Sequence, residues 1–312
     1  MAGLFRHHVQ ALPWDGHGRI VTVWGPTGSP GRSTLAAALA GTLAPSGRVV
    51  LVDADRNRGA LGPLLGVTGG GNVVSAATMP APPGTPCRPR DLHAHRAGFA
   101  LIRGVPGPAQ EVALDSADLT ALLLRLRLSF DLVLVDVGAA LPPREFGEAH
   151  LAALRAADLI LVVGALTHLG LSDLTLQTRA LAERLDAAGR GAGPPVWLVL
   201  NKGRGSLLRS GPGRVTADTG LPVAATLPLD TRNVVAAEEA RLPLTVARPR
   251  SPAAQLLGGL AVRLQRTLAP VPVHDCLDGG YSLDQEIPRR CLGAGNVGPS
   301  TVPGDDPEKS GR

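Results

Sequence analysis

Aromatic residues, cysteines and long apolar runs are all scarce in this sequence. Aromatic side chains account for 3% of its 312 residues, so the core has to be built from aliphatic side chains, as in helix-on-sheet packing. The three cysteines form no C-x-x-C pair, which argues against a zinc site or a disulfide framework and indicates a reducing cytoplasm. No segment approaches the apolar length that crosses a bilayer, and residues 1–18 lack the apolar centre of a secretory signal. We therefore expect a soluble protein without membrane insertion.

Lysine is almost absent as well. Of the 31 basic residues only Lys202 and Lys309 are lysines, and the others are arginines. With 26 acidic residues the net charge is +5, which permits contact with nucleic acid or acidic lipid without requiring it. Several arginines near the C-terminal end would suit non-specific DNA, but Glu238 and Glu239 interrupt them, so a solvated face is the favoured interpretation. These arginines are Arg232, Arg241, Arg248, Arg250, Arg263 and Arg266.

Short runs rich in Val and Leu alternate with helical patterns along most of the chain. The runs are typical of strands buried on both faces, and they cover Arg19–Trp24, Arg48–Val52, Phe99–Ile102, Leu132–Val135, Leu159–Val163, Val196–Leu200 and Val223–Leu227. The helical patterns cover Ser33–Leu43, Ser116–Leu128, Glu148–Ala157, Ser172–Ala188, Thr231–Ala240 and Pro252–Leu268. This alternation predicts an α/β fold, with a doubly wound, mainly parallel sheet flanked by helices over residues 19–268.

Three segments resist assignment to regular structure. Residues 1–18 are expected to be a flexible N-terminal segment. Gly69–Arg90, which is rich in proline, is expected to be a mobile surface insertion, and residues 269–312, dense in Gly, Pro and charge, a disordered tail.

A glycine-rich loop, Gly25–Thr34, follows the first apolar run and precedes an alanine-rich helical segment. In such a unit the backbone N–H groups of the loop can surround a polyphosphate, and the start of the helix adds partial positive charge. Arg32 stands where the P-loop pattern has lysine; it keeps the charge but brings a planar fork. A simple strand-to-helix turn of a Rossmann-like fold is the rejected alternative. The residues expected to bind phosphate are Gly28, Ser29, Pro30, Gly31, Arg32, Ser33 and Thr34, and the Ser33 hydroxyl is also the expected direct Mg²⁺ ligand.

Aspartates stand at the ends of the predicted strands. Asp53 and Asp55 are two residues apart, so they share one side of an extended chain and face the crevice where open α/β sheets bind ligands. Asp136 ends an apolar strand in the form of a Walker B motif and would hold the water shell of Mg²⁺. Gly138 would let a backbone N–H approach a terminal phosphate. The alternative for Asp53 and Asp55 is a pair of solvated residues at a strand end.

The strand that ends at Leu200 runs into Asn201, Lys202, Gly203 and Arg204. A guanine-specific N-K-x-D site needs a carboxylate at the fourth position, where this chain has Arg204, so adenine is the expected base. Asn201 would contact the polar edge of adenine, and the stem of Lys202 would lie along the ring. A turn-forming role is an equally weighted alternative for Asn201.

Taken together and in this order, these elements resemble the MinD/ParA superfamily of deviant Walker A ATPases, within the wider group that includes CpaE/TadZ-like pilus-assembly proteins. The resemblance covers about residues 19–268. It rests on the loop Gly25–Thr34, Val52–Asp55, Asp131–Asp136, Val162–Ala165 with Ser172 and Asp173, Asn201, and a last block of Leu227–Asp230, Val234, Ala236 and Pro243–Leu244.

The resemblance implies a P-loop NTPase of the SIMIBI type that binds ATP and Mg²⁺ and hydrolyses ATP slowly. It implies Ser33 and Asp136 at Mg²⁺ with Asp53 beside the metal, and Asp55 orienting the attacking water. It also implies that Asn201 and Pro228 frame adenine, and that Arg32 neutralises charge during catalysis.

The chain departs from the family pattern at two loop positions. Thr27 stands where the family has its extra lysine, and Arg32 replaces the ordinary P-loop lysine. The implied function is a nucleotide-dependent positioning or partitioning factor that forms a homodimer on ATP binding and has a protein partner in a partitioning or pilus system. The alternative is a non-catalytic CpaE/TadZ-like scaffold for pilus or secretion machinery.

Two further features receive structural interpretations. His93 and His95 lie two residues apart without an evident third ligand, so a polar loop is favoured over a metal pair. The segment Pro252–Leu268 has an apolar face, and a polar segment follows it, so core packing is favoured over a membrane-targeting helix.

Overall fold

An eight-stranded sheet organises the part of the chain that the structure describes. The computed structural model describes residues 18–28, 30–55, 59–80, 82, 85, 90–105, 114–139, 148–186 and 193–269. The strand order is β3-β4-β2-β5-β1-β6-β7-β8, and every pairing is parallel except that between β3 and β4. The strands are β1 (Arg19–Trp24), β2 (Val49–Asp53), β3 (His93–Ala94), β4 (Ala100–Ile102), β5 (Leu132–Asp136), β6 (Leu159–Ala165), β7 (Val196–Gly203) and β8 (Val223–Pro228).

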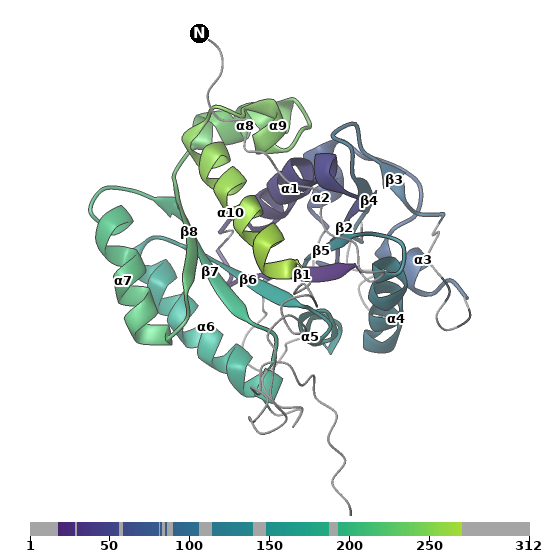
Figure 1. Cartoon of the computed structure of the whole chain (residues 1–312), viewed down its shortest axis with the longest axis horizontal. Coiled ribbons are helices and arrows are strands. Elements are labelled where there is room, and N and C mark those ends of the chain that lie inside the picture. The colour runs from purple at the N-terminus through teal and green to yellow at the C-terminus, as the bar shows by residue number, and fades with distance from the viewer. Residues whose placement is uncertain are drawn as a thin grey trace, which may run out of the picture. The chain divides into compact units, whose positions relative to one another are not determined.

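Helices cover both faces of this sheet (Figure 1). One face carries α1 (Arg32–Leu43), α2 (Leu61–Leu65), α8 (Thr231–Glu239), α9 (Leu244–Ala247) and α10 (Pro252–Leu268). The other carries α3 (Val73–Ala77), α4 (Ser116–Arg127), α5 (Glu148–Arg155), α6 (His168–Asp186) and α7 (Leu207–Thr219), and a 3-10 turn, η1 (Ala44–Ser46), follows α1. The doubly wound α/β prediction is confirmed.

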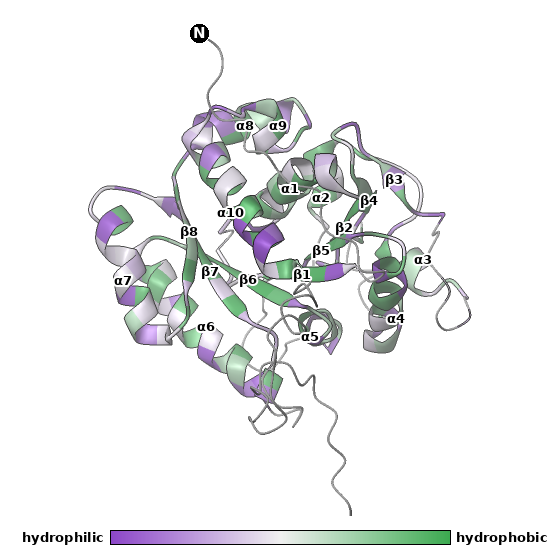
Figure 2. Ribbon diagram, in the orientation of Figure 1, coloured by the Kyte–Doolittle hydropathy of each residue, from purple (hydrophilic) through white to green (hydrophobic). Residues whose placement is uncertain are grey.

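The strands have a core on each side because their side chains alternate. In β1, Ile20 and Trp24 pack with the α3–α7 layer, whereas Val21 and Val23 pack with the layer that contains α1 and α10. The central strands are therefore mainly hydrophobic, although β2 and β5 end in the buried Asp53 and Asp136, and many hydrophilic residues lie on the outer helices (Figure 2). None of the helices in the described residues is long and apolar enough to cross a membrane.

The structure corrects the sequence prediction in several places. Gly69–Arg90 is not wholly irregular, because α3 begins there with a capping box in which Asn72 and Ser75 bond each other's backbone N–H groups. His93 and His95 do not lie in a polar loop: His93 belongs to β3, and His95 is buried and stacked on Phe99, with ring centroids 4.8 Å apart.

Helix α7 was not predicted, since its sequence contains Gly211, Pro212 and Gly213. Packing of its buried Val215 against the core outweighs this poor helix propensity. The predicted flexible segment at residues 1–18 lies almost wholly outside the described residues, and so does the predicted tail at residues 269–312. Both stay predictions.

Helix α10 packs into the core, as its apolar face predicts. Leu257, Leu260 and Leu264 are buried among side chains of β1, β6 and α1, while Leu256 faces outward with 45% of its surface exposed. The hydrophobic side of this helix is therefore mostly occupied by the sheet.

We expect Leu260→Ala to lower the free energy of unfolding by about 2–5 kcal/mol, because it removes buried methyl groups and leaves a cavity. That loss corresponds to a fall in melting temperature of roughly 4–20 °C. Leu256→Ala, on the same helix, is the matched control and should change stability by less than about 0.5 kcal/mol. Equal losses in the two variants, measured by thermal melts, would contradict the packing of α10.

Candidate functional site

The glycine-rich loop lies where β1 meets α1, at the carboxyl edge of the sheet. Thr27 and Gly28 are exposed, and Ser29 lies outside the described residues. Helix α1 begins at Arg32, and its N-cap residue Gly31 makes no side-chain capping bond. The first-turn N–H groups of α1, including those of Ser33 and Thr34, therefore have no side-chain cap and can receive an anion.

Arg32 is the first residue of α1, and its side chain turns back over the loop. Its Nη1 donates to the carbonyl oxygens of Pro26 at 2.6 Å and of Gly25 at 3.3 Å. Burial lowers the pKa of Arg32, and the nearby carboxylates of Asp136 and Asp55 raise it. The guanidinium stays charged, because arginine does not deprotonate in proteins. It therefore brings a positive charge to the loop and close to the carboxylates of Asp136 and Asp55.

Asp136 ends β5 in the centre of the sheet, and its carboxyl group is almost completely buried. Neither carboxylate oxygen makes a hydrogen bond of standard geometry. Burial raises the pKa of Asp136 to about 7, although the facing Ser33 hydroxyl and the Arg32 guanidinium lower it. Buried carboxylate oxygens without donors, beside a serine hydroxyl, fit a small hard cation such as Mg²⁺.

The protein side chains would not hold this cation alone. Within the described residues no group of three or more His, Cys, Asp or Glu side chains could hold a metal ion. Mg²⁺ typically binds through one or two protein groups together with waters and phosphate oxygens, so the pair of Ser33 and Asp136 suits a metal that arrives with a polyphosphate.

Asp53 lies next to Asp136 in the register of β2 and β5 and is fully buried. Its Oδ2 accepts a hydrogen bond from the Leu61 backbone N–H at 2.9 Å, and its Oδ1 accepts one from the Asp55 N–H at 3.2 Å. Burial and the charge of Asp136 raise the pKa of Asp53 to about 8, against these two bonds. Both oxygens therefore accept hydrogen bonds from the backbone, one of them at Leu61, the first residue of α2. The predicted role of Asp53 beside the metal stays a prediction.

Asp55 lies against Gly138 across the strand ends. A Cβ atom at Gly138 would lie 2.1 Å from Asp55 Oδ1, so any larger residue would displace the carboxylate. From the sequence we expect Gly138 to let a backbone N–H approach a terminal phosphate. The structure adds a second reason for glycine there, which is to make room for the Asp55 side chain.

Asn201 reaches the phosphate loop from the end of β7. Its Nδ2 donates to the Pro30 carbonyl oxygen at 2.7 Å, and its Oδ1 accepts from the Lys202 N–H at 2.8 Å. Gly31 has a φ of 95°, and a Cβ atom there would lie 2.4 Å from Asn201 Nδ2. The loop end therefore requires glycine both for its backbone conformation and for the approach of Asn201.

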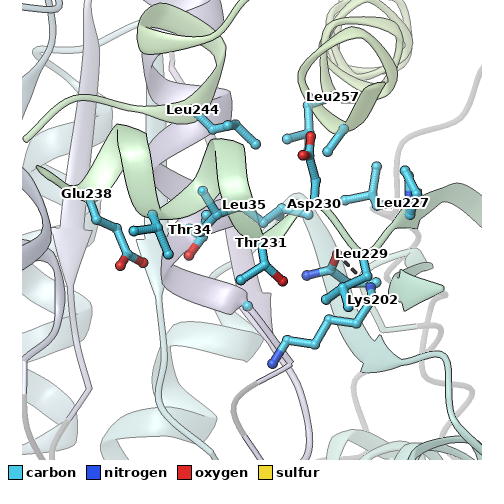
Figure 3. A pocket seen from close by; sticks show the side chains of 16 residues that line it. Thr34, Leu35, Lys202, Leu227, Leu229, Asp230, Thr231, Glu238, Leu244 and Leu257 are labelled. Atoms are coloured by element: carbon cyan, nitrogen blue, oxygen red, sulfur yellow. Dashed lines mark hydrogen bonds between the residues drawn. The ribbon is translucent and has the colours of Figure 1, made fainter. Parts of the chain in front are cut away.

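A pocket of about 270 Å³ opens beside this contact. Asn201, Lys202 and Pro228 line it, as the predicted base site requires, together with Gly31 at the loop end. Figure 3 shows Leu244 and Leu257 on one side of the pocket and Lys202 on the other. A mainly apolar cavity with a few polar groups, next to a helix N-terminus, suits a ring joined to phosphates.

The structure thus brings the predicted residues together at one edge of the sheet. Arg32, Ser33, Asp55 and Asp136 gather near the loop, and the predicted base site adjoins them. Sequence reasoning missed residues of α8 that line the pocket, and no motif marks them, because they differ from ordinary exposed helix positions only in what they face. They are Thr231, Val235 and Glu238.

The C-terminal arginines are exposed, as a solvated face predicts. Arg263 has a specific contact, because its guanidinium carbon lies 4.7 Å from the centre of the Trp197 ring. Arg241 packs against Gly66, where a Cβ atom would lie 2.4 Å from Arg241 Cδ. At least these two arginines have structural contacts.

We expect Asp136→Asn to stabilise the protein in the absence of nucleotide and Mg²⁺. The raised pKa of Asp136 means that the folded state holds a proton that the unfolded state has lost, so wild-type stability falls as pH rises from about 4 to about 7. The advantage of the variant should be smallest near pH 4 and should grow as the pH rises toward 7. Thermal melts in EDTA at several pH values measure the stability difference between the variant and wild type. Asp115→Asn, at an exposed helix cap, is the control. A stability difference that does not change with pH would contradict the raised pKa of Asp136.

No protein-family model matches the sequence, and no curated protein matches it significantly. Solved structures do match. MinD from Pyrococcus horikoshii, complexed with Mg-ADP, is 20% identical with a TM-score of 0.65, over 80% of this chain and 97% of that one. A ParA family ATPase from Chlorobium tepidum is 18% identical with a TM-score of 0.64, over 80% and 99%.

A cobyrinic acid a,c-diamide synthase from Mycobacterium smegmatis, with bound ADP and magnesium, is 19% identical with a TM-score of 0.59, over 80% of this chain and 94% of that one. Each likeness covers about four fifths of this chain and nearly the whole of the other. The chain therefore has the doubly wound fold of MinD and the ParA family ATPases.

Proposed function

We propose that the protein binds ATP with Mg²⁺ and hydrolyses it slowly. The observation that carries this proposal is the buried carboxyl group of Asp136, whose oxygens make no hydrogen bond of standard geometry and face the Ser33 hydroxyl at the uncapped start of α1. The similar MinD and diamide synthase structures contain ADP with magnesium, which supports the same ligand here.

Each part of the site has a distinct task in this reaction. The first-turn N–H groups of α1 and the Arg32 guanidinium would bind the phosphates, and Ser33 and Asp136 would hold Mg²⁺. When bound, the ion neutralises charge that develops on the phosphate oxygens. Asp55 would orient a water molecule toward the terminal phosphate, and glycine at position 138 leaves room for its carboxylate. The base occupies the pocket beside Asn201 and Pro228.

The output of this cycle is a change in association. A nucleotide-dependent homodimer and a protein partner in a partitioning or pilus system are the associations that the sequence resemblance implies, and the exposed arginines allow non-specific DNA as a further ligand. The protein would then act as a cytoplasmic positioning or partitioning factor.

A non-catalytic scaffold of the CpaE/TadZ kind is the second candidate. Exposed Thr27 favours it, because the side chain at this loop position carries no charge that could reach a partner's phosphates. This candidate retains ATP binding without turnover, so a direct assay of phosphate release separates the two.

Arg32→Ala should raise the Kd for Mg-ATP about 10- to 100-fold, because it removes a charged donor to the phosphates and the bonds to the Gly25 and Pro26 carbonyls. Arg32→Lys keeps the charge and should retain most of the affinity. Calorimetric titration with Mg-ATP measures both, and Arg209→Ala, at an exposed position of α7, is the control. An unchanged Kd in Arg32→Ala would remove Arg32 from the binding site.

Asp55→Ala should lower the rate of phosphate release about 100-fold while the Kd for Mg-ATP changes little, because the carboxylate acts on the attacking water. Asp186→Ala, exposed at the end of α6, controls for the loss of one carboxylate. Equal rates in wild type and Asp55→Ala would exclude this role. Tight binding without any release in the wild type would favour the scaffold.

A further inference from the structure

Three hydrogen bonds hold Asn201 at the loop. Its backbone carbonyl oxygen accepts from the Leu166 N–H at 2.7 Å, which ties the end of β7 to the turn before α6. Its side-chain oxygen accepts from the Lys202 N–H at 2.8 Å, and its side-chain nitrogen donates to the Pro30 carbonyl at 2.7 Å. The side-chain amide is therefore oriented by a hydrogen bond within β7, and its N–H group points to the loop.

The backbone at Lys202 is adapted to this arrangement. Lys202 has a φ of 61°, in the left-handed region that side chains other than glycine rarely adopt. The pairing of β7 with β8 also shifts register between Leu200 and Gly203. Such a conformation is strained in residues other than glycine, and it persists where the surroundings fix it, often at functional sites.

The loop is held at both of its ends. Arg32 bonds the carbonyls of Gly25 and Pro26 at the start of the loop, and Asn201 bonds Pro30 at its end. Pro30 and Gly31 lead directly into the first turn of α1, whose N–H groups are the expected phosphate donors. A change at Asn201 would therefore move the end of the loop that sets the direction of these donors.

We propose that Asn201 is a positioning residue for the phosphate loop, and that it contributes to affinity for the triphosphate itself as well as for the base. This inference rests on the proposed ATP site. It adds to the predicted contact with adenine a second role for Asn201, which is to orient the phosphate loop. One N–H of Asn201 is used by Pro30, and the second remains for the base in the pocket that Asn201 also lines.

A comparison of ATP with inorganic tripolyphosphate, both with Mg²⁺, separates the two tasks. Asn201→Ala should weaken the binding of each by about three- to tenfold, because the loop loses the bond to Pro30. Val234→Ala is the matched control. Val234, on α8, lines the base pocket, so this variant should weaken the binding of ATP and leave the binding of tripolyphosphate unchanged. Calorimetric titration gives each Kd.

Asn201→Asp sharpens the test, because it keeps the size of the side chain but replaces the donor by an oxygen facing the Pro30 carbonyl. It should weaken tripolyphosphate at least as much as Asn201→Ala does. If Asn201→Ala weakens ATP but leaves tripolyphosphate unchanged, Asn201 serves the base alone and the proposal is wrong.

Hydrogen exchange of the unliganded protein tests the positioning role independently of any ligand. Peptides that span the loop and the start of α1 should exchange faster in Asn201→Ala than in wild type, while peptides from α10 stay unchanged and show that the variant is folded. Wild type that binds neither ATP nor tripolyphosphate would defeat the proposed function, and loop exchange would still decide the role of Asn201. Equal exchange at the loop would overturn that role.

Discussion

The buried carboxyl group of Asp136 is the constraint on which the site depends. It lies at the end of a central strand and is almost completely buried, and its neighbour in the adjacent strand is the fully buried Asp53. Burying a carboxylate without donors is costly, and two of them together cost more. For Asp53 this cost is partly offset by hydrogen bonds from two backbone N–H groups. Asp136 has Ser33 and Arg32 nearby, but its carboxylate makes no hydrogen bond of standard geometry. A ligand that brings a cation would therefore reduce the unfavourable free energy of burying the Asp136 carboxylate. Such a ligand stabilises the folded state.

The loop that would hold the phosphates derives its shape from outside itself. Glycines allow its backbone conformation but do not impose it, since glycine is the most flexible residue. The contacts of Arg32 at one end and Asn201 at the other restrict this freedom, and the second comes from a strand about 170 residues further along the chain. Preorganised donors lose less entropy on binding, so under the proposed function the distant strand would contribute to phosphate binding through the loop.

Much of this architecture is readable from the sequence, for a definite reason. Strands buried on both faces need continuous apolar runs, and parallel strands bring their carboxyl ends to one edge, so an acid after each run is placed near the others. The sequence does not reveal which backbone group each acid meets. Asp53 and Asp136 end similar strands, yet only Asp53 accepts hydrogen bonds of standard geometry, from the backbone N–H groups of Asp55 and Leu61. Asn201 likewise looks like an adenine contact in sequence, and its bond to Pro30 joins residues 171 positions apart, which no local pattern indicates.

The replacement of lysine by arginine has a geometric consequence at this site. A lysine ammonium is a point charge, and its bonds to loop carbonyls compete with bonds to a phosphate for the same small group. The arginine fork spreads its donors over a plane, so Nη1 can stay on the Gly25 and Pro26 carbonyls while the remaining N–H groups face an anion. Arg32 can therefore hold the loop and bind phosphate at once. In this chain the charge at the loop and the shape of the loop are maintained by the same side chain, which ties the binding of nucleotide to the packing of α1.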